Sequence, residues 1–142
     1  AHNPAPAVRL LDIAAIAVLV AAICGEALAD RQLQCFTADP DNKGRVCNVG
    51  LWAWSRHPNY FFEWIVWLAY PLFAFGADYP QGWLAWLAPA VMYAVLVHGT
   101  GIPPLEEHMS RSRGGAWDAY RQRTSIFLPI PPWCGRRGKL RP

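Results

Sequence analysis

The sequence predicts an all-α fold, a multi-pass transmembrane helical bundle with three spans and an amphipathic C-terminal helix on the cytoplasmic side. Two observations carry this prediction. First, the apolar residues gather in three long runs instead of being interleaved with polar ones. Second, only 16% of the 142 residues are charged and 54% are hydrophobic, whereas about 25% of residues are charged in an ordinary soluble domain. The length suits a single structural unit.

The first predicted span covers residues 7–29. This run is built almost entirely from Ala, Val, Ile and Leu, with Arg9 and Asp12 near its start and Glu26 towards its end. About 20 predominantly apolar residues are enough for a helix to cross the hydrocarbon core of a bilayer. We therefore expect this run to form the first transmembrane helix.

Residues 58–77 and 82–101 form the second and third predicted spans. Pro58 suits the first position of a helix, where its missing N–H would be unpaired in any case. The second run also contains Pro71 and the third contains Pro89. Because membrane helices tolerate internal prolines, we expect a kink at each of these two positions and not a break.

The basic residues predict the orientation of the spans. All of them except Arg9 lie in the segment 31–56 or after Met109, whereas the turn around Asp78 has none. Segments rich in Lys and Arg stay on the cytoplasmic side. We therefore expect an integral membrane protein with a cytoplasmic C-terminus, in the bacterial inner membrane rather than the endoplasmic reticulum. Since these residues flank apolar spans and accompany no nucleic-acid motif, no nucleic-acid partner is expected.

The segment after the third span is too polar to cross a membrane. Pro103 and Pro104 predict a helix that starts just after them, with Glu106 and Glu107 in its first turn, where the helix dipole favours acidic residues. Gly114 and its glycine neighbour predict a break before a second short helical stretch. An alternative is an interfacial helix that lays a basic face on lipid headgroups.

Acidic and amide side chains predict a polar pocket at the cytoplasmic membrane boundary. Asn59, Glu63 and Trp67 fall at i, i+4 and i+8, on one face of the second span. Glu26 and Asp30 have the same spacing at the end of the first span. Because a carboxylate inside a bilayer is costly, we expect these two faces to meet around a shared pocket. Alternatively, Glu63 lies in the interfacial zone and reaches water.

The charges around this pocket indicate a phosphorylated ligand with a flat ring. Guanidinium groups suit bidentate phosphate recognition. Carboxylates and an amide below them suit ribose hydroxyls or a carboxamide, and tryptophans can stack on a ring. The alternative is that the arginines only fix the topology. The basic residues concerned are Lys43, Arg45, Arg56, Arg111, Arg121 and Arg123. The four cysteines form no CxxC pair or zinc-type cluster, so no metal site is expected.

Several short motifs follow one another along the chain in a fixed order. They are Gly25-Glu26-Ala27-Leu28-Ala29-Asp30-Arg31-Gln32, Asn42-Lys43-Gly44-Arg45, Gly50-Leu51-Trp52, Arg56-His57-Pro58-Asn59-Tyr60, Glu63, Leu105-Glu106-Glu107, Tyr120, Arg123-Thr124 and Phe127-Leu128-Pro129. Together they resemble the membrane family DUF1295, which is related to the C-terminal region of steroid 5-alpha-reductases. More distant relatives are sterol reductases and isoprenylcysteine carboxyl methyltransferases. The resemblance identifies residues 1–142 as the C-terminal, cofactor-binding region of such a protein.

The resemblance implies a membrane-embedded reductase that uses NADPH to reduce a carbon-carbon double bond in a lipid or steroid-like enone. It assigns no catalytic residue here, since in steroid reductases the groups that polarise the substrate carbonyl come from the N-terminal half. Two departures from the family pattern are Phe62, which replaces a glycine, and Glu26, which stands where asparagine is common. The implied cofactor contacts are Asp30, Arg56, Asn59, Tyr60, Glu63, Trp67, Glu106, Glu107, Arg111, Tyr120 and Arg123.

Two other interpretations stay open. Isoprenylcysteine and phospholipid methyltransferases share Arg-His-Pro before a membrane helix and a later Glu-Glu pair, which there bind S-adenosylmethionine. Asn59 and Glu63 favour the reductase branch, because the methyltransferases usually place an apolar residue after the proline. A non-catalytic membrane relative that has kept only the scaffold is the third interpretation. His57 has an alternative of its own, because without a charged substrate it is only a helix cap or an interface residue.

Overall fold

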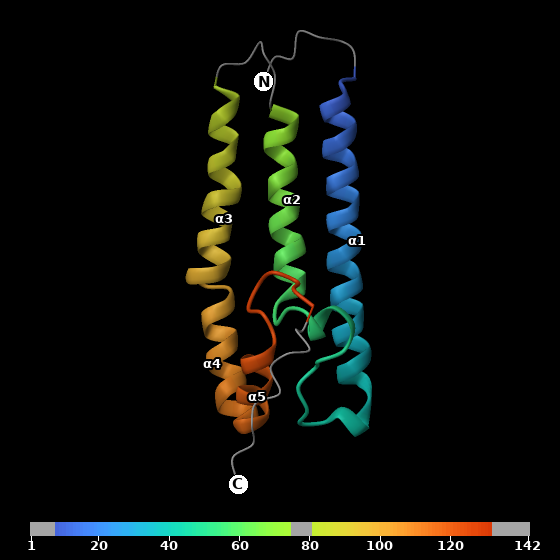
Figure 1. Ribbon diagram of the computed structural model, residues 1–142, viewed down its shortest axis with the longest axis vertical. Helices are drawn as coiled ribbons and strands as arrows, with labels where there is room; N and C mark the ends of the chain where they lie inside the picture. Colours follow the sequence, from blue (N-terminus) through green and yellow to red (C-terminus); the bar gives the residue numbers. More distant parts are fainter. Residues whose placement is uncertain (1–7, 75–80, 132–142) are drawn as a thin grey trace.

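The structure, a computed structural model, describes residues 8–74 and 81–131, and these residues are helical apart from loops and one isolated β-bridge. Three long helices lie side by side, and short helices and loops gather at one end of them (Figure 1). We call that end, which carries residues 39–57 and 99–131, the loop end. The elements are α1 (Leu10–Ala38), η1 (Pro40–Asn42), η2 (Gly50–Ala53), α2 (Pro58–Ala74), η3 (Gly82–Trp86), α3 (Leu87–His98), α4 (Ile102–Arg113) and α5 (Gly115–Arg123).

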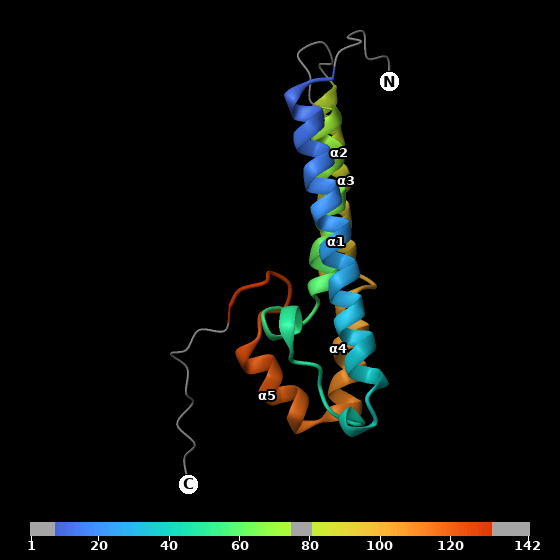
Figure 2. The same cartoon turned by 90° about the vertical axis from the view of Figure 1, so that its right-hand side faces the viewer.

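The three long helices form a single layer with α2 in the middle, which Figure 2 shows edge-on. The contact between α1 and α2 is the most extensive one. Within this contact the Phe62 ring lies against Gly25, so closely that a Cβ atom on Gly25 would be 2.4 Å from Phe62 Cε1. Phe62, the departure from the family pattern, therefore fills a helix contact and does not line the cavity described below.

The layer leaves large apolar side chains exposed on its surface. Ile16 and Ile23 on α1 are each about half exposed, and Val91 on α3 is 60% exposed. Among the described residues, α1 and the stretch Gly82–Arg113 are long and apolar enough to cross a membrane. The second predicted span, expected over 58–77, corresponds to α2 (Pro58–Ala74), and residues 75–77 lie outside the described residues. It therefore remains a prediction.

The prolines of the spans lie at two different kinds of position. Pro71 is inside α2, as expected, and is buried. Pro89 instead lies in the first turn of α3, directly after η3. Since η3 runs directly into α3, Pro89 lies where a 3-10 helix passes into an α-helix. The kinks expected at Pro71 and Pro89 stay predictions.

Helix α1 continues to Ala38, well beyond the predicted end of the first span at residue 29. The extra turns are polar, and two contacts hold them at the loop end. Trp52 Nε1 donates to the Ala29 carbonyl at 2.8 Å, and Gln32 Oε1 accepts from the Leu51 N–H at 2.9 Å. The apolar run ends at residue 29, whereas the backbone hydrogen bonds of the helix continue to Ala38.

The third run also differs from its predicted limits. It is divided into η3 and α3, and α3 ends at His98, three residues before the predicted end. α4 then begins at Ile102, so Pro103 and Pro104 are inside its first turn and not ahead of it. The acidic pair consequently lies in the second turn, which corrects the expectation that the helix dipole places it. Gly114, with φ +52°, separates α4 from α5 at the expected break.

Candidate functional site

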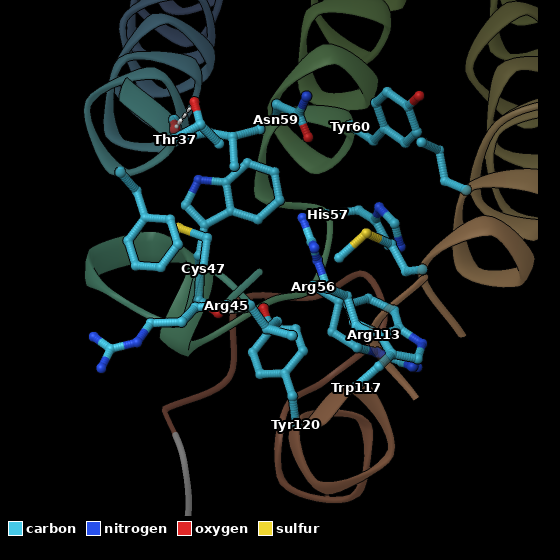
Figure 3. Close-up of a pocket in the computed structure, with 16 residues that line it drawn as sticks. Thr37, Arg45, Cys47, Arg56, His57, Asn59, Tyr60, Arg113, Trp117 and Tyr120 are labelled. Carbon is cyan, nitrogen blue, oxygen red and sulfur yellow. Dashed lines mark hydrogen bonds between the residues drawn. The ribbon is translucent and has the colours of Figure 1, made fainter. Parts of the chain in front are cut away.

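A cavity of about 360 Å³ lies at the loop end, between the polar end of α1, the start of α2, α4 and α5 (Figure 3). Its walls combine aromatic and aliphatic side chains with three arginines, and no Asp or Glu is among the lining residues. The lining residues are Leu33, Phe36, Thr37, Arg45, Val46, Cys47, Trp52, Arg56, His57, Asn59, Tyr60, Leu105, Met109, Arg113, Trp117 and Tyr120. The wall of the cavity is therefore mostly apolar, and its charged side chains are all cationic.

Arg56 is the most deeply placed charge of the cavity, with 8% of its surface exposed. Its Nη1 forms an ion pair with Glu106 Oε1 at 2.9 Å, and the same oxygen lies 3.3 Å from His57 Nε2. Burial lowers the pKa of the Arg56 guanidinium, but an arginine stays protonated in a protein. Glu106 thus holds both Arg56 and His57 from behind the cavity wall.

His57 is neutral at physiological pH. Burial, and then the neighbouring Arg56 charge, lower the pKa of its imidazole to about 4. Because Glu106 Oε1 only accepts hydrogen bonds when ionised, we assign the imidazole proton to Nε2. His57 therefore contributes a polar but uncharged surface to the cavity.

Several buried N–H donors around the cavity have no acceptor among the described residues. They are Arg56 Nε, Arg113 Nε and Trp117 Nε1, and Arg56 Nη1 has its ion pair but no well-aligned hydrogen bond. All three residues line the cavity. Leaving a buried donor unpaired costs about 1–3 kcal/mol, and such groups are rare in native proteins. The donor set is complementary to a ligand rich in acceptor oxygens.

Tyr120 fixes the floor of the cavity to the rest of the loop end. Its side chain is almost completely buried, and its hydroxyl donates to the Trp52 carbonyl at 2.5 Å. The same hydroxyl lies 3.3 Å from the Ser55 carbonyl. Burial raises the pKa of Tyr120, so the hydroxyl keeps its proton and remains a donor. Helix α5 is therefore attached to the segment that carries Arg56 and His57.

The extended residues 124–131, which we call the strap, run back from α5 along the segment before α2. The Arg56 N–H donates to the Ser125 carbonyl at 2.8 Å, next to an isolated β-bridge between Ser55 and Ser125. Ser55 Oγ donates to the Phe127 carbonyl at 2.8 Å. The strap thus fixes the backbone that presents Arg56 to the cavity.

Comparison with known proteins gives the family. The family model described as a protein of unknown function (DUF1295) matches residues 1–124. The chain belongs to the DUF1295 family. An uncharacterized protein of Schizosaccharomyces pombe is 35% identical over 95 residues, which are 66% of this chain and 27% of that relative. The chain thus spans about a quarter of the relative's length. No solved structure matches it.

In this DUF1295 protein, four of the residues expected to contact a cofactor line the cavity: Arg56, Asn59, Tyr60 and Tyr120. Two more support lining residues from behind. Asp30 Oδ1 accepts a hydrogen bond from Asn59 Nδ2 at 3.1 Å, and Glu106 pairs with Arg56. The structure therefore joins α1 and α2 at one site, as the acidic and amide pattern indicated, and Glu106 adds α4 to it.

Glu63 and Trp67 lie outside the cavity wall, further along α2. Glu26 is close enough to Asp30 and to Glu63 to interact electrostatically, so the two acidic faces meet as expected, but none of these three carboxylates lines the cavity. The Trp67 ring packs against Tyr70, with 5.6 Å between centroids. Glu63 and Trp67 therefore continue the face of α2 that carries Asn59, in the direction away from the cavity.

The remaining expected contacts are not brought to the cavity. Arg111 and Glu107 form an ion pair with each other on the surface of α4, with 78% and 61% of their side chains exposed. Arg123, the last residue of α5, is exposed as well. These three residues were expected over the cofactor, and the structure places them on the outside of the loop end.

Arg113 and Trp117 were not predicted from the sequence, and neither were the apolar residues of the cavity wall. A signal for one wall was present. Leu105, Met109 and Arg113 follow one another at intervals of four residues, so they share one face of α4, and all three line the cavity. Trp117 had no such signal, because the turn at Gly114 decides which face of α5 points inward.

Proposed function

We propose that this chain forms the cofactor-binding part of a membrane-embedded reductase. The enzyme would use NADPH to reduce a carbon-carbon double bond in a lipid or steroid-like enone. The motif resemblance to steroid 5-alpha-reductase relatives suggests this chemistry. The observation that carries the proposal is the set of buried N–H donors of Arg56, Arg113 and Trp117 around one cationic cavity.

The cavity residues fit a phosphorylated nucleotide. Arg45, Arg56 and Arg113 supply forked donors that match phosphate oxygens. Trp52 and Trp117 supply flat walls on which a base can stack. When bound, NADPH would supply the hydride for the reduction. No metal ion is invoked, and the proton donor belongs to parts of the enzyme that contact the substrate.

The cavity volume bears on how a dinucleotide would lie. About 360 Å³ is near the lower end of the roughly 300–1,000 Å³ usual for ligand pockets. The cavity therefore suits one nucleotide half, and the other half would extend along α2 past Asn59 towards Glu63. Asp30 fixes the Asn59 amide in place for a ribose hydroxyl or a carboxamide.

The apolar helix layer supports a location in a membrane, from which a lipid substrate would enter laterally. We propose the bacterial inner membrane, with the loop end and the C-terminus in the cytoplasm. The basic side chains of the loop end favour this orientation. The cavity would then open towards the compartment that holds NADPH.

A methyltransferase is the second candidate. The volume that suits half a dinucleotide also suits a whole single nucleoside such as S-adenosylmethionine. The Arg56-His57-Pro58 motif, shared with that branch, contributes two residues to the cavity wall. Against this candidate, the cavity wall is cationic, whereas S-adenosylmethionine carries a positive sulfonium.

Equilibrium binding separates the candidates. The purified chain in detergent is titrated with NADPH and, separately, with tritiated S-adenosylmethionine. We expect saturable binding of NADPH only. Arg113→Gln removes a charge-assisted contact from the cavity and should weaken NADPH binding about 10-fold, whereas Arg111→Gln, an exposed arginine on the same helix, should leave the affinity unchanged. Binding of S-adenosylmethionine alone would favour the methyltransferase, and binding of neither would remove both enzyme proposals.

A further inference from the structure

The strap has a buried side and an exposed apolar side. Phe127 is buried, with 3% of its surface exposed, whereas Ile126, Leu128 and Ile130 on either side of it are 39%, 50% and 55% exposed. The Ile130 N–H donates to the Trp54 carbonyl at 3.2 Å, which brings the 45% exposed Trp54 next to them. Four large apolar side chains are therefore exposed on the strap and on the segment hydrogen-bonded to it, and we call this set the strap patch.

Phe127 shows how far the strap reaches along the helix layer. Its ring packs against Trp64 of α2 and Tyr93 of α3, with centroid distances of 5.8 and 5.5 Å. Trp64 is six residues into α2, which is about 9 Å along the helix axis. Tyr93 is five residues before the end of α3, which is about 7.5 Å. The Phe127 ring thus reaches past the first turn of α2 and the last turn of α3, and the strap lies near the loop end of the helix layer (Figure 2).

The backbone of the strap is only partly paired within the protein. Pro129 and Pro131 have no N–H, and the Thr124 and Ile130 N–H groups are hydrogen-bonded. The Ser125 and Phe127 carbonyls accept hydrogen bonds from the segment before α2. The N–H groups of residues 125–128 have no hydrogen-bond partner among the described residues. Because unpaired N–H groups are costly where no water can bind them, such a backbone suits the headgroup boundary, which water reaches, and not the hydrocarbon core.

The flanking charges match the level of lipid headgroups. Arg121 and Arg123 are exposed on the last turn of α5, directly before the strap. Basic side chains at such a boundary interact with lipid phosphates, and a tryptophan such as Trp54 prefers the same zone. The order from α5 to the strap is therefore basic first and apolar second, as it is on crossing from water into a bilayer.

We propose that the strap patch is inserted in the leaflet next to the loop end, at the boundary between acyl chains and headgroups. The patch comprises Trp54, Ile126, Leu128 and Ile130, with Arg121 and Arg123 at the lipid phosphates. This inference rests on the proposed membrane location of the chain, and it adds a membrane contact outside the helices. Because the strap is also hydrogen-bonded to the backbone of Arg56, one segment contacts both the bilayer and the backbone that places Arg56 in the cavity.

Depth measurement by spin labelling tests the proposal. The native cysteines are replaced by alanine, the full chain is reconstituted in lipid nanodiscs, and single labels are placed by Leu128→Cys and, as a second variant, Ile126→Cys. Ile16→Cys, on the exposed face of α1, is the control for a lipid-facing span. Gln122→Cys, exposed on α5, is the control for water. The accessibility of each label to oxygen and to a nickel chelate is then measured.

We expect the oxygen-to-nickel accessibility ratio at Leu128 and Ile126 to be several-fold higher than at Gln122 and to approach the ratio at Ile16. A nickel accessibility at both strap positions equal to that at Gln122 would place the strap in water and overturn the inference. Low accessibility to both reagents would mean that protein covers the patch, and this also overturns it. If Ile16 itself were open to the nickel chelate, the membrane location would fail, which is a distinguishable result.

Discussion

Glu106 and Glu107 are neighbours on α4 that form ion pairs of different kinds. Glu106 and its partner Arg56 have 16% and 8% of their side chains exposed, whereas Glu107 and its partner Arg111 have 61% and 78% exposed. Glu106 also contacts His57, and the Arg111 pair stands alone on the helix surface. The two glutamates therefore make a matched pair for measuring how burial changes the contribution of an ion pair to stability.

Glu106→Gln removes the charge opposite a buried guanidinium. Breaking a buried pair by removing one partner costs about 3–5 kcal/mol. Because glutamine keeps one oxygen that can accept from Arg56 or His57, we expect a loss of about 2–3 kcal/mol in the free energy of unfolding. Glu107→Gln removes an exposed i, i+4 pair, which contributes only about 0.3–0.5 kcal/mol.

Thermal unfolding in detergent, followed by far-UV circular dichroism, measures both variants. For a chain of about this length, 1 kcal/mol corresponds to about 2–4 °C in Tm. We expect Glu106→Gln to lower Tm by about 5–10 °C and Glu107→Gln by about 1–2 °C at most. Equal losses in the two variants, or a Glu106→Gln chain as stable as the original, would refute the inference that Glu106 compensates the buried charge of Arg56.

The remaining predictions concern packing, protonation and the cavity floor. Gly25→Ala should destabilise the chain by about 1–3 kcal/mol, despite the higher helix propensity of alanine, because the new Cβ meets the Phe62 ring. Adding Phe62→Ala to the same chain should recover part of this loss. If chemical unfolding showed that the losses of the two substitutions add up, the clash would be contradicted. The free energy of unfolding should fall as the pH drops from about 6.5 towards 4, by at most about 1.4 kcal/mol per pH unit from His57, since the unfolded imidazole binds a proton that the folded one resists. His57→Gln should make that decline shallower, and an unchanged slope would mean that other groups cause it. Tyr120→Phe should cost about 1–3 kcal/mol by leaving the Trp52 carbonyl without its donor, and unfolding at the original denaturant midpoint would show that water replaces the hydroxyl.

The helices were largely predictable because their signals are local. Apolar runs placed α1, α2 and the stretch of η3 and α3, and Pro58 marked the start of α2 correctly. The ends were less predictable. α1 extends beyond its apolar run, where the segment that carries Leu51 and Trp52 is hydrogen-bonded to Gln32 and Ala29. The hydropathy of the sequence cannot predict such a contact.

The site was predictable in part. Asn59 and Asp30 were expected to share a pocket, and they are hydrogen-bonded to each other. The spacing on α4 was compatible with either face turning inward, and the acidic pair drew attention to Glu107 and Arg111. The structure turns the face of Arg113 to the cavity instead. The sequence of a helix does not say which of its faces will be buried, because that depends on the neighbouring elements that pack against it.

By itself, the sequence determined the helical class, the family and the chemical character of the loop end, because hydropathy, short motifs and charge are properties of neighbouring residues. Only the tertiary structure decided which side chains share the cavity. Arg56 meets Glu106 from a distant segment, and Phe127 reaches between α2 and α3 from beyond α5. Such partners are selected by the burial of whole faces, which depends on how the helices pack together and not on the order of residues along any one of them.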